Sequence, residues 1–92
     1  MSYVLEFSKT ALEDIEKHKR SGDKATLKKI EKLLNELMEH PTVGTGQPEK
    51  LKHDLAGLYS RRINRKHRLI YSINEMIVTV NVLGAWSHYG DK

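Results

Sequence analysis

Hydrophobic and polar positions alternate at the start of the chain and then recur with a helical period. Residues Tyr3 to Phe7 alternate and are rich in β-forming side chains, which predicts an opening strand. Ser8 is a suitable N-cap for a first helix, which we expect to close at Ser21-Gly22. The apolar positions of this helix, at helical spacing, are Ala11, Leu12 and Ile15.

A second helix is predicted after Asp23, which is its expected N-cap. A proline biases the residue before it away from helical backbone angles, so this helix must end before Pro41. The short break at Ser21-Gly22 makes the two helices a hairpin. The second helix carries one continuous apolar stripe, which we expect in the core: Leu27, Ile30, Leu33, Leu34, Leu37 and Met38.

Beyond the second helix the pattern changes to the alternation typical of strands. Residues 41–48 contain Gly44, Gly46 and both prolines, which predicts a long loop. Three strands are expected over residues 58–64, 67–73 and 76–83, with turns at 64–66 and 74–75, as an antiparallel meander. The order β-α-α-β-β-β predicts a single α+β domain over residues 1–92, with the helical hairpin packed on one face of a small, mostly antiparallel sheet.

The composition narrows the class of protein. Ninety-two residues fit one compact domain. The chain has no cysteine, which excludes a disulfide framework, a thiolate metal site and a cysteine nucleophile. No apolar stretch approaches the ~20 residues of a membrane span, and the first residues do not resemble a signal peptide. We therefore expect a cytoplasmic protein with no membrane partner.

Positive charge is concentrated in the middle of the chain, within a net charge of +4. Asp54 is the only acid between residues 50 and 68. The basic residues of this basic segment are Lys50, Lys52, Arg61, Arg62, Arg65, Lys66 and Arg68. A polyanion such as nucleic acid, or an acidic protein segment, is its natural complement. A solvated basic surface explains the charge equally well.

The sheet face away from the helices is the expected place for a site. If residues 64–66 form a three-residue turn, Arg62 and Arg68 lie opposite each other on this face, with Ser60 and Ile70, whereas a two-residue turn separates them. Arginines on an exposed sheet face are also common as solvated residues that discourage edge pairing. Taken alone, Glu49 is an ordinary loop acid and His88 an exposed histidine.

No metal or cofactor site is expected. His18 and His40 are predicted on the polar parts of the two helices, and no histidine has a zinc-type spacing to a second ligand. The adjacent His53 and Asp54 have no accompanying nucleophile, and neighbouring side chains in a strand or turn point apart.

Several separated motifs resemble the RelE/YoeB-type toxins. They are Gly-Thr-Gly-Gln-Pro-Glu over residues 44–49, the continuation to residue 64, His-Arg-Leu-Ile-Tyr over residues 67–71 and His-Tyr at residues 88–89. The resemblance implies a RelE-like fold, similar to microbial ribonucleases, and a ribosome-dependent mRNA interferase from a bacterial toxin–antitoxin pair. The implied partners are mRNA, the ribosome and a cognate antitoxin, in a homodimer or a toxin–antitoxin hetero-oligomer. An acidic, partly disordered antitoxin tail is expected to cover residues 50–68.

The resemblance also implies roles for single residues. Glu49 matches the general base and Arg68 the arginine that stabilises the reacting phosphate. His88 matches the general acid, and Tyr89 the aromatic residue beside it. Further residues expected to contact phosphate, by the resemblance or by their place in the basic segment, are Lys52, Arg62, Arg61 and Arg65.

These residue types fit the chemistry of RNA cleavage. RNA carries its own nucleophile, the 2′-OH, so cleavage needs a base, an acid for the leaving 5′-oxygen and cations for the charged transition state. Glutamate, histidine and arginine supply all three. Two alternatives remain: a non-catalytic ParE-like toxin that binds a topoisomerase, and a basic module that only binds nucleic acid.

Overall fold

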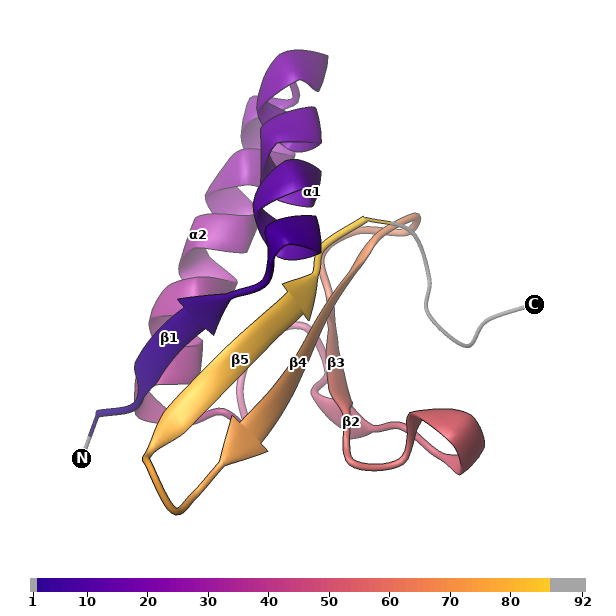
Figure 1. The fold of residues 1–92 in the computed structure, drawn as a ribbon. Coiled ribbons are helices and arrows are strands. Elements are labelled where there is room, and N and C mark those ends of the chain that lie inside the picture. Colours follow the sequence, from indigo (N-terminus) through magenta and orange to yellow (C-terminus); the bar gives the residue numbers. More distant parts are fainter. Residues whose placement is uncertain (1, 87–92) are drawn as a thin grey trace.

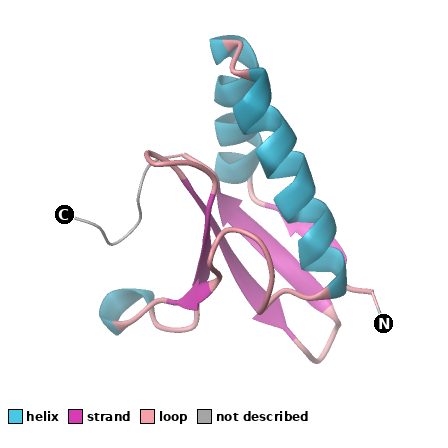
Figure 2. Ribbon diagram, turned by 180° about the vertical axis from the view of Figure 1, so that it is seen from behind, coloured by secondary structure: helices cyan, strands magenta, loops and turns pink. Residues whose placement is uncertain are grey.

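Two helices lie against one face of a five-stranded sheet in the computed structural model, which describes residues 2–86 (Figure 1). The view from behind shows both helices on the same side of the strands (Figure 2). The elements are β1 (Val4–Phe7), α1 (Lys9–Ser21), α2 (Lys24–Glu39), β2 (Glu49–Lys50), the 3-10 helix η1 (His53–Leu55), β3 (Tyr59–Arg62), β4 (Arg68–Asn74) and β5 (Thr79–Gly84). The expected α+β class is confirmed.

The sheet is mixed, with the strand order β1-β5-β4-β3-β2. Strands β2 to β5 pair antiparallel, as expected for a meander, and β1 pairs parallel to β5 from Val4 with Thr79 to Phe7 with Val82. The last strand of the meander therefore lies beside the first strand of the chain. Neither helix of residues 2–86 has the length and hydrophobicity of a membrane span.

Both helices begin and end where the capping residues predict. The Ser8 hydroxyl oxygen accepts a hydrogen bond from Ala11 N at 3.0 Å, and Gly22 closes α1 in a left-handed conformation. Asp23 accepts from Thr26 N at 3.0 Å at the start of α2. The second helix ends at Glu39, two residues before Pro41.

The core lies between α2 and the sheet. Ile30, Leu33 and Leu37 form the buried part of the predicted stripe. They belong to one apolar cluster with the inward side chains of β4 and β5, namely Leu69, Tyr71, Val80 and Val82. Leu12, expected on the apolar side of α1, is instead 56% exposed. The alternation of each strand turns one set of side chains to this core and leaves the other set on the open face of the sheet.

Three features differ from the sequence expectation. The two-residue strand β2 and the 3-10 helix η1 lie between the predicted loop and the predicted strand at residues 58–64, where no element was expected. The last strand begins at Thr79, because the Asn74 side-chain oxygen accepts from Met76 N at 3.0 Å and holds this segment in a turn. Met76 is consequently 92% exposed rather than part of a strand.

His18 is buried, so its predicted place on the polar part of α1 is wrong. Its Nε2 lies 2.8 Å from the Ala85 carbonyl oxygen, and Asp14 on the same helix accepts from Ala85 N at 2.9 Å. Two side chains one helical turn apart thus bind both backbone groups of one residue at the end of β5. The ring of Trp86 packs against both His18 and His67.

Replacing Leu33, which is fully buried, with Ala should lower the free energy of unfolding by roughly 2–5 kcal/mol through lost burial and a residual cavity. Leu12→Ala is the matched control on the exposed side of the hairpin and should change it by less than about 0.5 kcal/mol. Urea denaturation followed by circular dichroism measures both. Equal losses in the two variants would contradict the position of the core.

Candidate active site on the open face of the sheet

A small polar pocket of about 100 Å³ lies at the β2 side of the open face. It is lined by Gly46, Gln47, Glu49, Ser60, Arg62 and Arg68. These residues come from the long loop and from three neighbouring strands. The pocket therefore gathers chain segments that are separated by up to 22 residues onto one rigid sheet.

The register of the sheet explains this gathering. Arg62 pairs directly with Arg68 across β3 and β4, and Glu49 pairs with Ser60 across β2 and β3. The β3–β4 turn has the three-residue form because Ile63 N donates to His67 O at 3.0 Å. The expected pairing of Arg62 and Arg68 on the open face is therefore confirmed.

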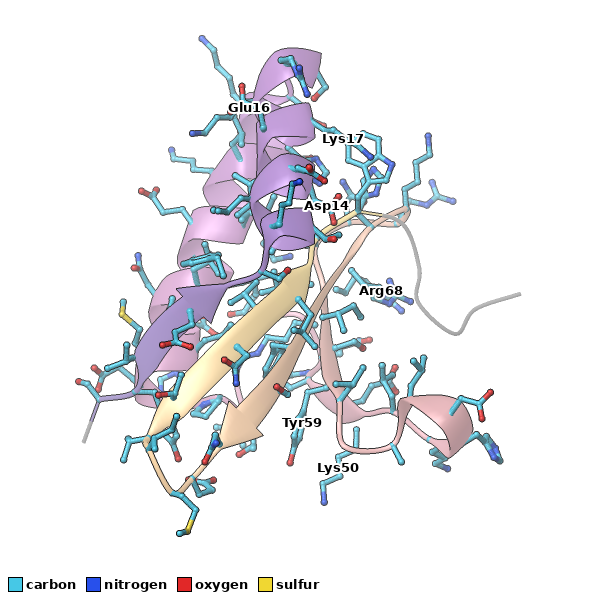
Figure 3. All side chains as sticks on the ribbon, viewed as in Figure 1. Asp14, Glu16, Lys17, Lys50, Tyr59 and Arg68 are labelled. Atoms are coloured by element: carbon cyan, nitrogen blue, oxygen red, sulfur yellow. The ribbon has the colours of Figure 1, made fainter. Side chains whose placement is uncertain are left out.

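Arg68 carries the most distinctive electrostatic feature of the pocket. Its Nη1 is buried and has no hydrogen-bond partner within residues 2–86. An unpaired buried donor costs about 1–3 kcal/mol, and more when it is charged. Arg62 stands directly opposite, and like charges in such cross-strand pairs are destabilising. Figure 3 shows Arg68 on the side of the sheet away from the helices. An anion in the pocket would accept from the unpaired donor and reduce the repulsion between the two arginines.

Glu49 faces the same pocket from β2, where it is exposed. In the part of the chain that the structure describes, its carboxylate forms no ion pair with Arg62 or Arg68. The pocket thus combines a carboxylate, a hydroxyl and two guanidinium groups. The neighbouring Gln47 has a left-handed backbone with φ 52°, a conformation of order 1–3 kcal/mol above the usual ones that tends to occur at functional sites.

The other predicted site residues lie elsewhere. Lys52 is exposed just before η1, and Arg65 is exposed in the β3–β4 turn, and neither lines the pocket. His88 and Tyr89 lie outside the described residues. Ser60 and Gln47 were not expected to belong to the site. For Ser60 the signal was its predicted place on the same face as the arginines, whereas nothing in the sequence singled out Gln47.

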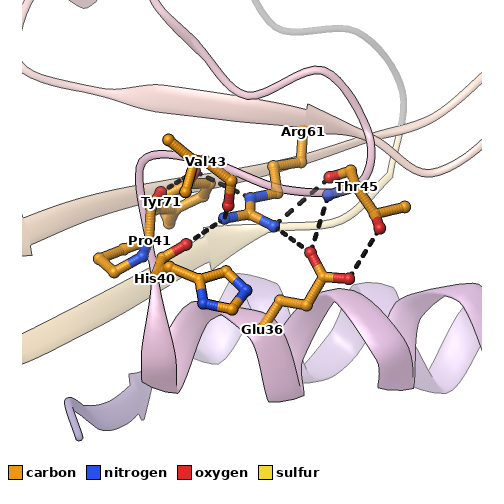
Figure 4. Close-up of polar contacts among 7 residues, drawn as sticks. All are labelled: Glu36, His40, Pro41, Val43, Thr45, Arg61 and Tyr71. Atoms are coloured by element: carbon orange, nitrogen blue, oxygen red, sulfur yellow. Dashed lines mark hydrogen bonds and ion pairs between the residues drawn. The ribbon is translucent and has the colours of Figure 1, made fainter. Parts of the chain in front are cut away.

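Arg61 does not belong to the pocket, and its expected contact with phosphate is wrong. Strand alternation turns it to the helix side of the sheet, where its side chain is fully buried. Its guanidinium donates to Glu36 Oε1 at 2.8 Å and to the Tyr71 hydroxyl at 3.2 Å. It also donates to three carbonyl oxygens of the segment that follows α2, namely those of His40, Val43 and Thr45 (Figure 4).

Glu36 is the counter-ion of this buried cation. Burial alone would raise its pKa, but hydrogen bonds from the Thr45 backbone and hydroxyl, at 2.8 and 2.7 Å, oppose that effect. Together with the Arg61 guanidinium they hold the pKa of Glu36 below its ordinary value. The ion pair and the loop are therefore coupled through one carboxylate.

No group of three or more His, Cys, Asp or Glu side chains within residues 2–86 is placed to hold a metal ion. The polar groups that converge on the pocket are instead suited to a phosphate-containing ligand. The fold and the pocket together define a small basic α+β domain with a polar pocket that contains two arginines on the open face of its sheet.

Comparisons with known proteins place this domain in a family. The family described as "YoeB-like toxin of bacterial type II toxin-antitoxin system" matches residues 7–89. Toxin YoeB of Escherichia coli K12 is 45% identical over 53 residues, which are 58% of this chain and 63% of that protein. This alignment thus spans less than two thirds of the relative's length. The chain belongs to the YoeB-like toxin family.

Solved structures agree with the fold. The YoeB/ParE toxin from Agrobacterium tumefaciens superposes with a TM-score of 0.86 at 32% identity, covering 94% of this chain and 99% of that one. A chain of the YoeB–YefM complex from Staphylococcus aureus superposes with a TM-score of 0.78 at 37% identity, covering 97% and 100%. The expected resemblance to this family is confirmed.

The Glu36 ion pair should make stability depend on pH in the acid range. Because the folded-state pKa lies below the ordinary value of 4.5, the stabilisation is present above that value and is lost as the pH falls through the folded-state pKa. The difference in free energy of unfolding between the wild type and Glu36→Gln should therefore shrink from pH 6 to pH 3. Glu31→Gln, an exposed change on the same helix, is the control and should show little difference at any pH. A constant Glu36→Gln difference would contradict the coupling.

Proposed function

We propose that this chain is the toxin of a type II toxin–antitoxin system and a ribosome-dependent endoribonuclease that cleaves mRNA. The observation that supports the proposal best is the buried Nη1 of Arg68, which has no hydrogen-bond partner within residues 2–86 and lies opposite Arg62 in one pocket with Glu49. A carboxylate beside two guanidinium groups that form no ion pair in the described part of the chain can accept a proton next to a bound phosphate. A surface that only binds nucleic acid has no use for a carboxylate at this position.

The proposed reaction uses the RNA's own 2′-OH as nucleophile. Glu49 accepts its proton, Arg68 stabilises the extra negative charge on the phosphorane, and Arg62 supports it. His88 protonates the leaving 5′-oxygen, with Tyr89 beside it; both roles come from the family resemblance. Lys52 and Arg65 contact backbone phosphates outside the pocket. In this scheme the arginines supply the positive charge, so no metal ion takes part in bond cleavage.

The proposed partner in the resting state is an antitoxin. The related Staphylococcus aureus protein forms a YoeB–YefM complex. An acidic antitoxin tail over the basic segment would neutralise the surface around the pocket and exclude mRNA from it. Because the proposed target is mRNA on the ribosome, we expect the protein to act in the cytoplasm.

Replacing Glu49 should impair catalysis, whereas replacing Lys52 should impair binding. Glu49→Gln should leave the affinity for programmed ribosomes nearly unchanged and lower the single-turnover cleavage rate by roughly 10² to 10⁴-fold, the usual contribution of a positioned base. Lys52→Ala should instead weaken binding and reduce its salt dependence, because one phosphate contact is lost. Quench-flow cleavage and filter binding at several salt concentrations measure the two quantities. Equal losses of rate and affinity in both variants would refute this division.

The nucleophile can be tested on the substrate. An mRNA with one 2′-deoxy sugar immediately 5′ of the scissile bond should bind at the same place and remain uncut, since the attacking oxygen is missing. The natural message should yield a 2′,3′-cyclic phosphate or 3′-phosphate on one side and a 5′-OH on the other. A 5′-phosphate product, or normal cutting of the deoxy message, would show that water is the nucleophile. Absence of any cleavage, together with inhibition of a topoisomerase, would favour the ParE-like alternative.

A further inference from the structure

The buried guanidinium of Arg61 connects three parts of the molecule: the helix α2, the segment that follows it and the strand β4. Its donors reach Glu36 on α2, Tyr71 on β4 and three carbonyl oxygens within residues 40–45. The Tyr71 hydroxyl, which accepts from Arg61, donates in turn to the Pro41 carbonyl oxygen at 2.6 Å. Most of these bonds are made to the start of the long loop, so Arg61 fastens that loop to the helix and the sheet (Figure 4).

The end of the same loop forms a wall of the pocket. The Gly46 carbonyl oxygen accepts from Arg62 N at 2.6 Å, so the loop lies directly on the backbone of β3. A Cβ at Gly46 would lie 2.8 Å from Arg62 O, and its φ of 87° also favours glycine. A Cβ at Gly44 would overlap the Glu36 carboxylate. The two glycines of the loop therefore permit its close approach to the Arg61 ion pair on one side and to the pocket strand on the other.

The free-energy cost of an unpaired buried cation means that the contacts of Arg61 with this loop are kept or lost together. A buried cation is tolerated only when its donors are paired, and loss of its partners leaves an uncompensated charge that is strongly destabilising. Lifting residues 40–45 from the sheet would remove three carbonyl acceptors from Arg61 at once. Arg61 therefore holds the loop that leads to Glu49 in one place, while the next residue, Arg62, faces the pocket.

We propose that Arg61, through Glu36 and Tyr71, is a positioning residue that sets Glu49 against Arg62 and Arg68 for RNA cleavage. This inference rests on the proposed function, since it gives Glu49 its catalytic role. Arg61 itself touches no substrate. It acts by restricting the loop of residues 40–48, and a displacement of Glu49 on the order of 1 Å would be enough to slow the reaction considerably.

Two nearly isosteric variants test the inference without removing the buried cation. Tyr71→Phe deletes one hydroxyl that binds Arg61 and Pro41, and Glu36→Gln removes the counter-ion charge. Tyr59→Phe is the matched control, because Tyr59 stacks on Tyr71 with ring centroids 5.6 Å apart and its hydroxyl forms no hydrogen bond within residues 2–86. Tyr71→Phe and Glu36→Gln should each lower the saturated single-turnover rate by about 10-fold. Ribosome affinity should stay within about twofold, and Tyr59→Phe should cleave at the wild-type rate.

A double-mutant cycle with Glu49→Gln separates positioning from general damage. If Arg61 acts through Glu49, adding Tyr71→Phe or Glu36→Gln to Glu49→Gln should cause no further loss of rate. A purely structural defect lowers the active fraction and so remains in the Glu49→Gln background. Amide hydrogen exchange should also speed up at Thr45 and Arg62, whose N–H groups bind Glu36 and Gly46.

The outcomes distinguish a failure of the proposed function from a failure of the inference about Arg61. If Glu49→Gln cleaves at the wild-type rate, the proposed function fails and the inference fails with it. If Glu49→Gln is slow but Tyr71→Phe and Glu36→Gln keep the full rate, or their losses add to that of Glu49→Gln, the inference is overturned while the proposed function stands. Unchanged exchange at Thr45 and Arg62 in both variants would also overturn it.

Discussion

The fold depends on how one buried positive charge is satisfied. Arg61 has no exposed surface, and its donors are taken up by an ion pair, a tyrosine hydroxyl and three backbone carbonyl groups. Two of its partners, Glu36 and Thr45, also bind each other. Removal of any partner leaves a polar group unpaired, so the end of α2, the loop and the middle of the sheet keep one relative arrangement.

Arg61 and its neighbour Arg62 show how strand alternation assigns opposite tasks to identical side chains. Arg61 faces the helix layer with its donors paired, whereas Arg62 faces the open side across from Arg68, whose Nη1 has no hydrogen-bond partner among the described residues. The paired donors of Arg61 stabilise the helix side of the sheet, whereas the buried, unpaired donor of Arg68 is unfavourable on the open side of the described sheet. Such a local departure from the rules of stable packing is expected where a ligand completes the structure.

The sequence predicted the features that have a local cause. Ser8 and Asp23 mark helix starts because their side chains cap nearby amides, and the stripe containing Leu33 repeats with the helical period. The pairing of Arg62 with Arg68 was expected only for a three-residue turn at residues 64–66, and the structure has that turn. The two-residue β2 is too short to show a period.

Features with distant causes were not predicted. The burial of Arg61 depends on Glu36, 25 residues away, which looks like any polar helix residue. His18 is likewise paired with the backbone of Ala85, 67 residues further along, a contact that no local pattern reveals. Charge alone suggested that Arg61 contacts RNA, although alternation from Arg62 already places it on the other face.

The strand order has a consequence for the route by which the molecule forms. The strand β5 lies between β1 and β4 and pairs with both, although it follows every other strand in the chain. The parallel pairing of β1 joins residues about 75 positions apart, and such non-local contacts slow folding because a large loop must close first. During synthesis on a ribosome, β1 and the helical hairpin emerge long before their partner strand. Arg62 and Arg68, on β3 and β4, therefore lie in a complete sheet only after β5 has left the exit tunnel. Folding is thus delayed until nearly the whole described chain has been made.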